Sequence, residues 1–293
     1  MRIAIFVIAL LLGSFNADAA KKNKIQPPPD GVSVLRDIVY KQPFIRPLEL
    51  DLYRPKNFKG RLPVVVWVHG GGWKNGSKNN CPAKFLAQHG FAVASIDYRL
   101  THHAQWPAQI DDCRSAVRWL RKNAGKYRLN PNKIGAWGSS AGGHLVAILG
   151  TIDAPDGEEV SSRVQAACDW FGPSDLLTMP YNMVSAKRTI EQVRNSNGAK
   201  LLGAAVPDIP KKARHASALH HVSVDDPPFL VMHGDEDPGV PIDQSNRFAA
   251  ALKKAKVDVT YHVVKGAGHG GKLFKTDEVN QLIIDFFSRT LKN

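Results

Sequence analysis

The sequence predicts an α/β protein built on one mostly parallel sheet. Two observations support this prediction. Short apolar segments of strand length alternate with longer segments of helical periodicity through most of the chain. Several of the short segments are apolar at every position, as in strands that helices cover on both faces of a parallel sheet. The 293 residues are enough for one large core.

The first half of the chain contains the early strands and one long helix. Residues 33–54 are predicted to form a strand pair, in which "LELDLYRP" alternates apolar and polar residues as an antiparallel strand does. Two continuously apolar strands follow, at 64–68 and 91–100. A helix begins at about Pro107, where the apolar residues take up helical spacing.

The second half repeats the alternation of strand and helix. A strand at 132–138 precedes a buried helix at 142–150. Two more strands are predicted at 227–234 and 257–266, with an amphipathic helix at 242–255 between them. The chain closes on a helix with one apolar stripe, made of Val279, Leu282, Ile283, Phe286 and Phe287.

The N-terminus is typical of a secretory signal peptide over residues 1–19. Arg2 supplies a basic start, an apolar core follows, and small residues precede a cleavage site after Ala19. Cleavage there predicts a secreted or periplasmic protein, and an uncleaved anchor is the alternative. The apolar core is short for a membrane span, so no stable membrane insertion is expected. Residues 20–32 are charged and proline-rich, which predicts a linker, and 33–293 form one domain.

One segment, residues 175–222, breaks the alternation. It has several prolines, an excess of basic residues and no clean strand pattern. Insertions of this length are usually lids or binding loops, so a small lid insertion is predicted here. We expect its apolar side chains to line a small pocket; these are Leu176, Leu177, Met179, Tyr181 and Met183.

Charge and cysteine content narrow the possible partners. The formal net charge is +13, which favours attraction to acidic polymers. The lysines and arginines are dispersed and no recognition motif is present, so no nucleic-acid partner is predicted. Three cysteines allow one bridge, and Cys81 with Cys113 is the pair to test first because both lie in polar segments. Cys168 is interpreted as a buried apolar residue, and no cluster of histidines or cysteines indicates a metal site.

A candidate nucleophile lies in "GSSAG", between the strand at 132–138 and the helix that follows. The central serine of this G-x-S-x-G pattern is Ser140. A sharp strand-to-helix turn needs small neighbours, and Gly138 and Gly142 meet that need. At the start of a helix the backbone N–H groups also favour negative charge, so Ser140 is well placed for nucleophilic attack.

A serine hydroxyl needs a base to take its proton, and a third group to orient that base. In proteins with this kind of turn, the acid and then the base follow the serine in chain order. Asp237 follows a predicted strand and His269 lies on a glycine-rich loop after the last strand, so both have the required order. Asp235 and Asp243 are rival acids, and we expect Asp235 to cap the turn instead.

Consecutive glycines in "HGGGW" follow the apolar strand at 64–68. They let backbone N–H groups converge on one point, as an oxyanion hole requires. The candidate donors are the N–H groups of Gly71, Gly72 and Ala141, whereas His69 is expected to brace the loop.

Five motifs in order carry a family resemblance: "HGGGW", "DYRL", "WPAQIDDC", "GSSAGGH" and "HGDEDPGVP". Over roughly residues 35–290 the chain resembles α/β-hydrolase esterases related to the hormone-sensitive-lipase group, and most of all the branch of secreted bacterial feruloyl and acetyl esterases. The resemblance implies an α/β-hydrolase fold with helices on both faces of the sheet. It assigns Ser140, Asp237 and His269 to a catalytic triad, and the three N–H groups above to the oxyanion hole. Ser139 stands where that group commonly has Asp, and the group's long N-terminal cap is missing, which argues against lipid substrates.

These observations together predict a serine carboxylesterase that needs no cofactor. The expected substrates are small-molecule or polysaccharide esters with acetyl to butyryl groups, and feruloyl esters are a further candidate. One alternative is a prolyl-oligopeptidase-like peptidase, which needs an anchor for an amino terminus, usually an acidic pair, whereas the insertion here is basic. The other is a non-catalytic binding module on a hydrolase fold, which usually lacks a triad or oxyanion residue. None is missing here.

Overall fold

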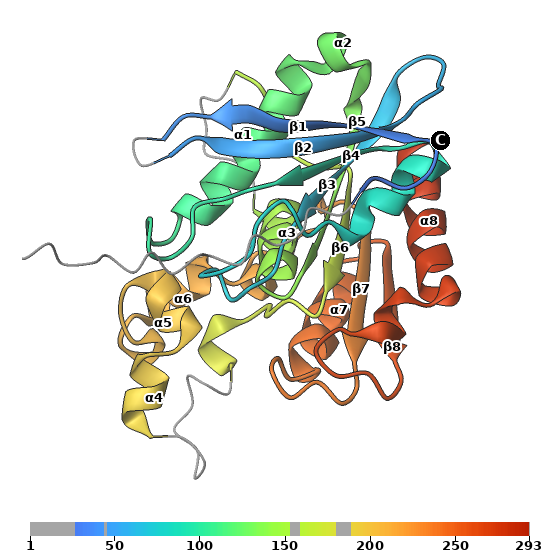
Figure 1. Cartoon of the computed structure of the whole chain (residues 1–293). Helices are drawn as coiled ribbons and strands as arrows, with labels where there is room; N and C mark the ends of the chain where they lie inside the picture. Colours follow the sequence, from blue (N-terminus) through green and yellow to red (C-terminus); the bar gives the residue numbers. More distant parts are fainter. Residues whose placement is uncertain (1–26, 44–45, 153–158, 180–188, 293) are drawn as a thin grey trace, which may run out of the picture.

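The computed structural model describes residues 27–43, 46–152, 159–179 and 189–292 (Figure 1). The predicted signal peptide and most of the predicted linker lie outside these ranges. Two of the residues expected to line the pocket, Tyr181 and Met183, also lie outside them. In the part of the chain that is described, no helix is both long enough and apolar enough to cross a bilayer.

An eight-stranded sheet forms the centre of the molecule, in the order β1-β2-β4-β3-β5-β6-β7-β8. Strand β2 runs antiparallel to both β1 and β4, and every pairing from β4 to β8 is parallel. The predicted mostly parallel sheet is therefore confirmed. The strands are β1 Val32–Lys41, β2 Leu48–Pro55, β3 Leu62–Val68, β4 Ala92–Ile96, β5 Leu129–Ser139, β6 Ala166–Trp170, β7 Phe229–Gly234 and β8 Val259–Val264.

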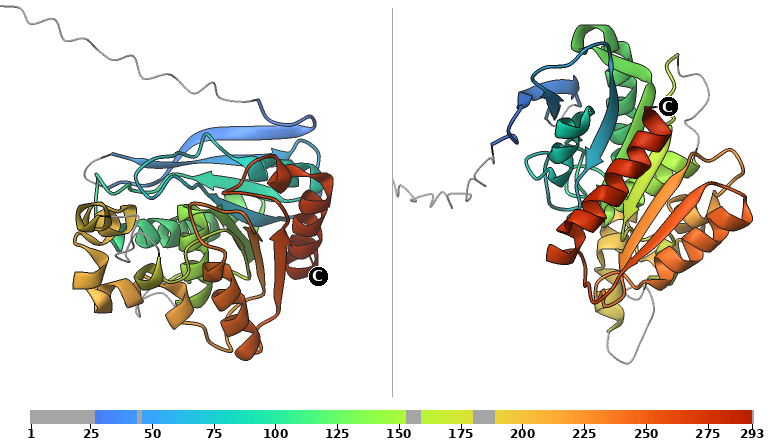
Figure 2. Two further views of the ribbon diagram at one scale, coloured as in Figure 1. Left: turned by 90° about the horizontal axis from the view of Figure 1, so that it is seen from below. Right: turned by 90° about the vertical axis from the view of Figure 1, so that its right-hand side faces the viewer.

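Helices cover both faces of the sheet, as predicted. The α-helices are α1 Ala108–Lys122, α2 Ala124–Tyr127, α3 Ala141–Thr151, α4 Ile190–Arg194, α5 Asn197–Leu202, α6 Pro210–His215, α7 Asp243–Lys254 and α8 Asp277–Leu291. Apolar residues of α1, α3 and α7 share one core with one face of the strands. Residues of α8 and of a 3-10 helix, η1 (Pro82–His89), share a second core with the other face. Figure 2 shows α7 and α8 on opposite sides of the strands.

One strand was not predicted. The stretch "AACDW" forms β6, which pairs with β5 on one side and β7 on the other. It is only 5 residues long and contains Asp169, so it lacks the unbroken apolar run that marks β3 as a buried strand. Its place inside the sheet comes from pairing with two strands that are distant in sequence.

The cysteines correct the suggested disulfide. Cys81, Cys113 and Cys168 are all free and buried. Cys81 lies in the core beside η1 and α8, whereas Cys113 lies in the core beside α1 and α3 on the other face of the sheet. The polar neighbours of Cys113 misled the prediction, because its helical position turns it inward. Cys168 is buried in β6, as predicted.

The insertion at about 175–222 contains short helices and no strand within its described residues. Besides α4, α5 and α6 it holds the 3-10 helices η2 Leu176–Thr178, η4 Val206–Asp208 and η5 Ala218–His220. Figure 1 shows α4, α5 and α6 grouped together beside the main body of the sheet.

Candidate active site

Ser140 lies in the sharp turn between β5 and α3. Its backbone has φ +55° and ψ −119°, a conformation that costs a non-glycine residue about 1–3 kcal/mol. The turn is closely packed: a Cβ on Gly138 would lie 2.3 Å from the carbonyl oxygen of Gly142, and one on Gly142 would lie 2.0 Å from that of Val68. The Ser140 N–H donates to the Trp170 carbonyl at 2.8 Å, which anchors the turn to β6. The two flanking glycines are thus a steric requirement of the turn.

The fold brings Ser140, His269 and Asp237 into one chain of hydrogen bonds. The Ser140 Oγ lies 2.8 Å from His269 Nε2, and His269 Nδ1 lies 2.6 Å from Asp237 Oδ2. Since a carboxylate only accepts, His269 donates from Nδ1, which leaves Nε2 to accept the serine hydroxyl. This is the arrangement in which a histidine can take the proton of a serine.

Asp237 is held as a carboxylate by its surroundings. Its Oδ1 accepts hydrogen bonds from the backbone N–H groups of Gly239 and Val240, at 2.7 and 2.9 Å. Burial by itself would raise the pKa of Asp237, but the hydrogen bonds from His233, His269 and the Val240 N–H outweigh burial and hold that pKa well below its ordinary range. The side chain therefore stays charged and fixed in orientation at neutral pH.

The two rival acids are engaged elsewhere. Asp235 accepts a hydrogen bond from the Gly266 N–H at 2.7 Å and pairs with Lys265 at 3.3 Å, so it links the loop after β7 to the turn after β8. Asp243 pairs with Arg247 along α7, at 2.7 Å.

His233 is a residue of this site that the sequence reasoning did not single out. It is completely buried at the end of β7, and its Nε2 lies 2.9 Å from the Val240 carbonyl and 3.3 Å from Asp237 Oδ2. Its Nδ1 lies 2.7 Å from the hydroxyl of Ser245 on α7. With Nε2 as the donor, His233 braces the loop that carries Asp237. The only signal in the sequence was a histidine at a strand end, four residues before Asp237.

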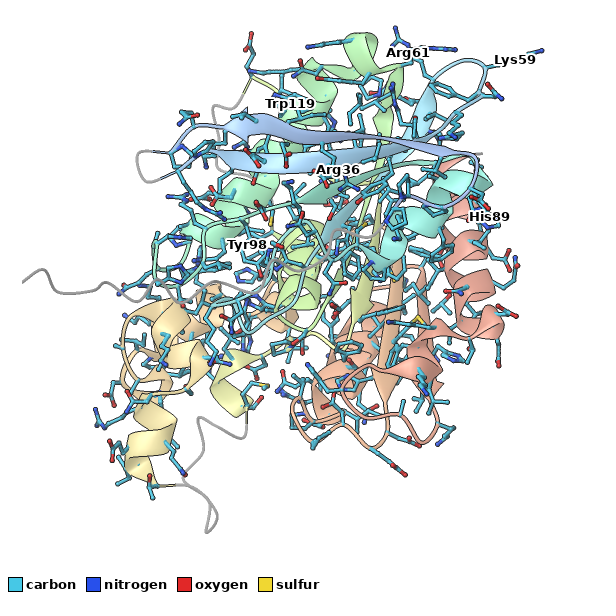
Figure 3. All side chains as sticks on the ribbon, in the orientation of Figure 1. Arg36, Lys59, Arg61, His89, Tyr98 and Trp119 are labelled. Carbon is cyan, nitrogen blue, oxygen red and sulfur yellow. The ribbon has the colours of Figure 1, made fainter. Side chains whose placement is uncertain are left out.

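The glycine loop after β3 faces Ser140. Gly71, Gly72 and Ala141 line the same cavity as Ser140 and His269, and Ala141 is the first residue of α3. His69 braces this loop: its Nδ1 lies 2.8 Å from the Gly70 carbonyl, and its ring stacks on Tyr98 with 4.3 Å between ring centres. Tyr98, labelled in Figure 3, also donates its hydroxyl to the His69 carbonyl at 3.0 Å.

The cavity in front of Ser140 has a volume of about 960 Å³. One wall comes from α4, α5 and the residues between them, and it is polar. The residues of this wall are Gln192, Asn195, Ser196, Asn197 and Lys200. Asn197 reaches the glycine loop, because a Cβ on Gly72 would lie 2.5 Å from its Nδ2.

The expected apolar pocket lining is wrong for the residues that are described. Leu176, Leu177 and Met179 are absent from the cavity lining, and Leu176 and Met179 are each 1% exposed. Leu176 packs into the core beside α1 and α3, and Leu177 packs against that core. Leu176 and Met179 thus face the protein interior, and the part of this segment that lines the cavity is the polar wall of α4, α5 and the residues between them.

One family profile and several curated proteins are similar to this chain in sequence. A family profile described as BD-FAE matches residues 50–252. Esterase LipC of Mycobacterium tuberculosis is 32% identical over 236 residues, which cover 75% of this chain and 56% of LipC. The chain spans little more than half the length of the curated relatives it matches first.

Solved structures are similar over nearly the whole chain. A truncated carbohydrate esterase from gut microbiota has a TM-score of 0.79 at 30% identity, and the match covers 92% of this chain and 100% of that one. The propionate-bound esterase Est2 of the Planctomycetes species Thermogutta terrifontis has a TM-score of 0.71 at 28% identity, with 89% and 94% covered.

Proposed function

The chain belongs to the BD-FAE family of α/β-hydrolase esterases, and from that premise we propose that it is a serine carboxylesterase. The observation that carries the proposal is the unbroken hydrogen-bond chain from Ser140 through His269 to Asp237 at the turn before α3. The glycine loop faces that turn across the same cavity. Nucleophile, base, orienting acid and oxyanion donors are thus all available at one point.

In the first half of the reaction, Ser140 attacks the ester carbonyl while His269 Nε2 takes the hydroxyl proton. The carbonyl oxygen becomes an oxyanion, which the N–H groups of Gly71, Gly72 and Ala141 stabilise. Each such donor typically contributes about 3–4 kcal/mol at the transition state. His269 then gives its proton to the departing alcohol, which leaves the acyl group on Ser140.

In the second half, His269 takes a proton from water, and the hydroxide attacks the acyl carbonyl. The tetrahedral intermediate collapses, Ser140 recovers its proton from His269, and the carboxylic acid leaves. Asp237 keeps the Nδ1 proton of His269 in place and stabilises the imidazolium that forms in both halves. No cofactor takes part in this sequence.

For the substrate, we propose a short acyl group on a hydroxylated alcohol. Polar residues outnumber apolar ones in the lining, and the apolar Trp73, Phe171 and Val240 are each at most 5% exposed, which argues against a long apolar groove for the acyl chain. The similar Est2 structure was solved with propionate bound, and the other similar structure is a carbohydrate esterase, which favours acetyl to butyryl esters of carbohydrates. Feruloyl esters are a further candidate. Residues 175–222 would then act as a lid that contacts the alcohol.

We also propose that residues 1–19 are a signal peptide, and that cleavage after Ala19 yields a secreted or periplasmic enzyme. The mass of the N-terminal peptide of the exported protein tests this directly. An intact Met1 in the mature protein would contradict it.

The proposed activity is tested with Ser140→Ala, using Ser139→Ala as the neighbouring control. Wild type should hydrolyse p-nitrophenyl acetate and butyrate but no peptide amide, and an organophosphonate should add once, at Ser140. Ser140→Ala should lose the label and several orders of magnitude of turnover, down to the level that the oxyanion hole alone provides. Ser139→Ala should keep the label. Labelling that survives in Ser140→Ala would overturn the assignment of the nucleophile.

A further inference from the structure

We infer that the cavity of Ser140 continues into a cationic subsite, and that the natural substrate is an ester of a carbohydrate that carries carboxylate groups. This inference rests on the proposed esterase function and deepens it. A short acyl group fills only the space around Ser140, so whatever reaches the far end of the cavity belongs to the alcohol part of the substrate.

The fully charged side chains that line the cavity are all positive. Among its lining residues in the described part of the chain, Lys74 and Lys200 carry full positive charge and there is no aspartate or glutamate. Lys74 directly follows Trp73 at the end of the glycine loop, and Lys200 lies on α5, one turn after Asn197. Both side chains are exposed, and neither forms an ion pair with a described residue. By contrast, Lys78, four residues after Lys74, is buried, and its Nζ lies 2.7 Å from Asp51 Oδ1.

Lys200 also lines a second cavity, of about 380 Å³. This cavity lies along the other side of α5, and its charged residues are again basic: Lys200 and Arg194, with His102 beside them. Arg194 is paired with Asp208 at 3.1 Å, but Asp208 is not part of the lining. A chain that passes Lys200 therefore stays close to a positive charge, and among the described residues neither cavity lining contains a carboxylate that would offset it. Concave surfaces with charge of one sign concentrate ligands of the opposite sign.

The chemistry between the charges points to a carbohydrate. The wall that carries Lys200 presents the side-chain amides of Gln192, Asn195 and Asn197, which can donate to and accept from sugar hydroxyls. The tryptophan and the phenylalanine in the lining, Trp73 and Phe171, are 3% and 5% exposed, so they offer little surface on which a nucleobase could stack. Amides for hydroxyls and lysines for carboxylates together match a chain of uronic acids.

The test compares two acetylated oligosaccharides of equal length, one an oligo-uronate and one a neutral xylo-oligosaccharide. Acetate release gives kcat/KM for each at low salt. We expect the oligo-uronate to be preferred at least about tenfold. Lys74→Gln and Lys200→Gln should each lower that preference about fivefold, which is the upper range for an exposed ion pair. The preference should also fall as NaCl is raised to about 0.5 M, because salt screens exposed charges.

Lys254→Gln, at the end of α7, is the matched control because Lys254 lines neither cavity and its loss changes the net charge equally. It should leave the preference at the wild-type value. Equal kcat/KM for the two oligosaccharides, or an equal loss on both in the lysine variants, would overturn the subsite. Equally strong inhibition by polyphosphate and by unacetylated oligo-uronate would overturn the carbohydrate assignment. These outcomes differ from a failure of the esterase proposal itself, in which wild type would release no product even from p-nitrophenyl acetate.

Discussion

Replacing Asp237 with asparagine tests its role as the acid of the triad, because the change exchanges a single oxygen atom, Oδ2, for an NH₂ group. The backbone N–H groups of Gly239 and Val240 both donate to Oδ1, so the amide of the asparagine must keep its carbonyl oxygen there. Its NH₂ group then takes the place of Oδ2 and points at His269 Nδ1, 2.6 Å away in wild type. Turning the amide over would leave two backbone donors without acceptors, at about 1–3 kcal/mol each.

The consequence is a reversed tautomer of His269. Since His269 Nδ1 now has to accept a hydrogen bond from the asparagine NH₂ group, the ring carries its proton on Nε2. Nε2 faces the Ser140 hydroxyl and then has no lone pair with which to take the serine proton. In the serine protease template the same change costs about ten-thousandfold in kcat, or about 5.5 kcal/mol. We expect Asp237→Asn to lower kcat on p-nitrophenyl acetate by that order, with a far smaller change in KM.

Asp235→Asn is the matched control, two residues away on the same loop. Its Oδ1 can still accept from the Gly266 N–H, and only the exposed pair with Lys265 is lost. Its kcat should stay within about threefold of wild type. Initial rates at pH 7, with circular dichroism to verify folding, decide the question. A mild Asp237→Asn together with a crippled Asp235→Asn would refute the assignment of the acid.

Two further predictions concern acyl length and pH. The ratio of kcat/KM for p-nitrophenyl butyrate to that for the decanoate should exceed one, because each extra methylene contributes about 0.8 kcal/mol only where an apolar surface receives it; a ratio below one would require an apolar groove. Burial raises the pKa of Asp169 from 3.8 to about 6, so the folded state holds this proton more tightly than the unfolded state does. The free energy of unfolding therefore falls as the pH rises from about 4 to 6, by about 3 kcal/mol in full. Urea denaturation at several pH values between 4 and 7 should show this loss in wild type and a flatter profile in Asp169→Asn; parallel profiles would contradict the reasoning.

Local patterns in the sequence were enough for most of the fold. Helix α7 was predicted at 242–255 and runs from Asp243 to Lys254, because its amphipathic spacing is a property of the segment itself. The strand predicted at 91–100 is shorter, since β4 ends at Ile96 and the chain then leaves the sheet. Strand β6 escaped prediction because a short segment with a buried aspartate becomes a strand only between two partners.

Strand-end position also pointed to Ser140, Asp237 and His269, because parallel strands bring the loops at their carboxyl ends to one edge of the sheet. What the sequence by itself determined was therefore the kind of fold, the turn that holds Ser140 and the order of its partners, all of which depend on neighbouring residues. Only the tertiary structure decided that His233 braces Asp237, that Cys81 and Cys113 lie on opposite faces, and that Asn197 and Lys200 face the cavity while Leu176 turns inward. Each of these depends on packing between segments far apart in the chain, and no periodicity within one segment records which way a side chain will face once another segment covers it.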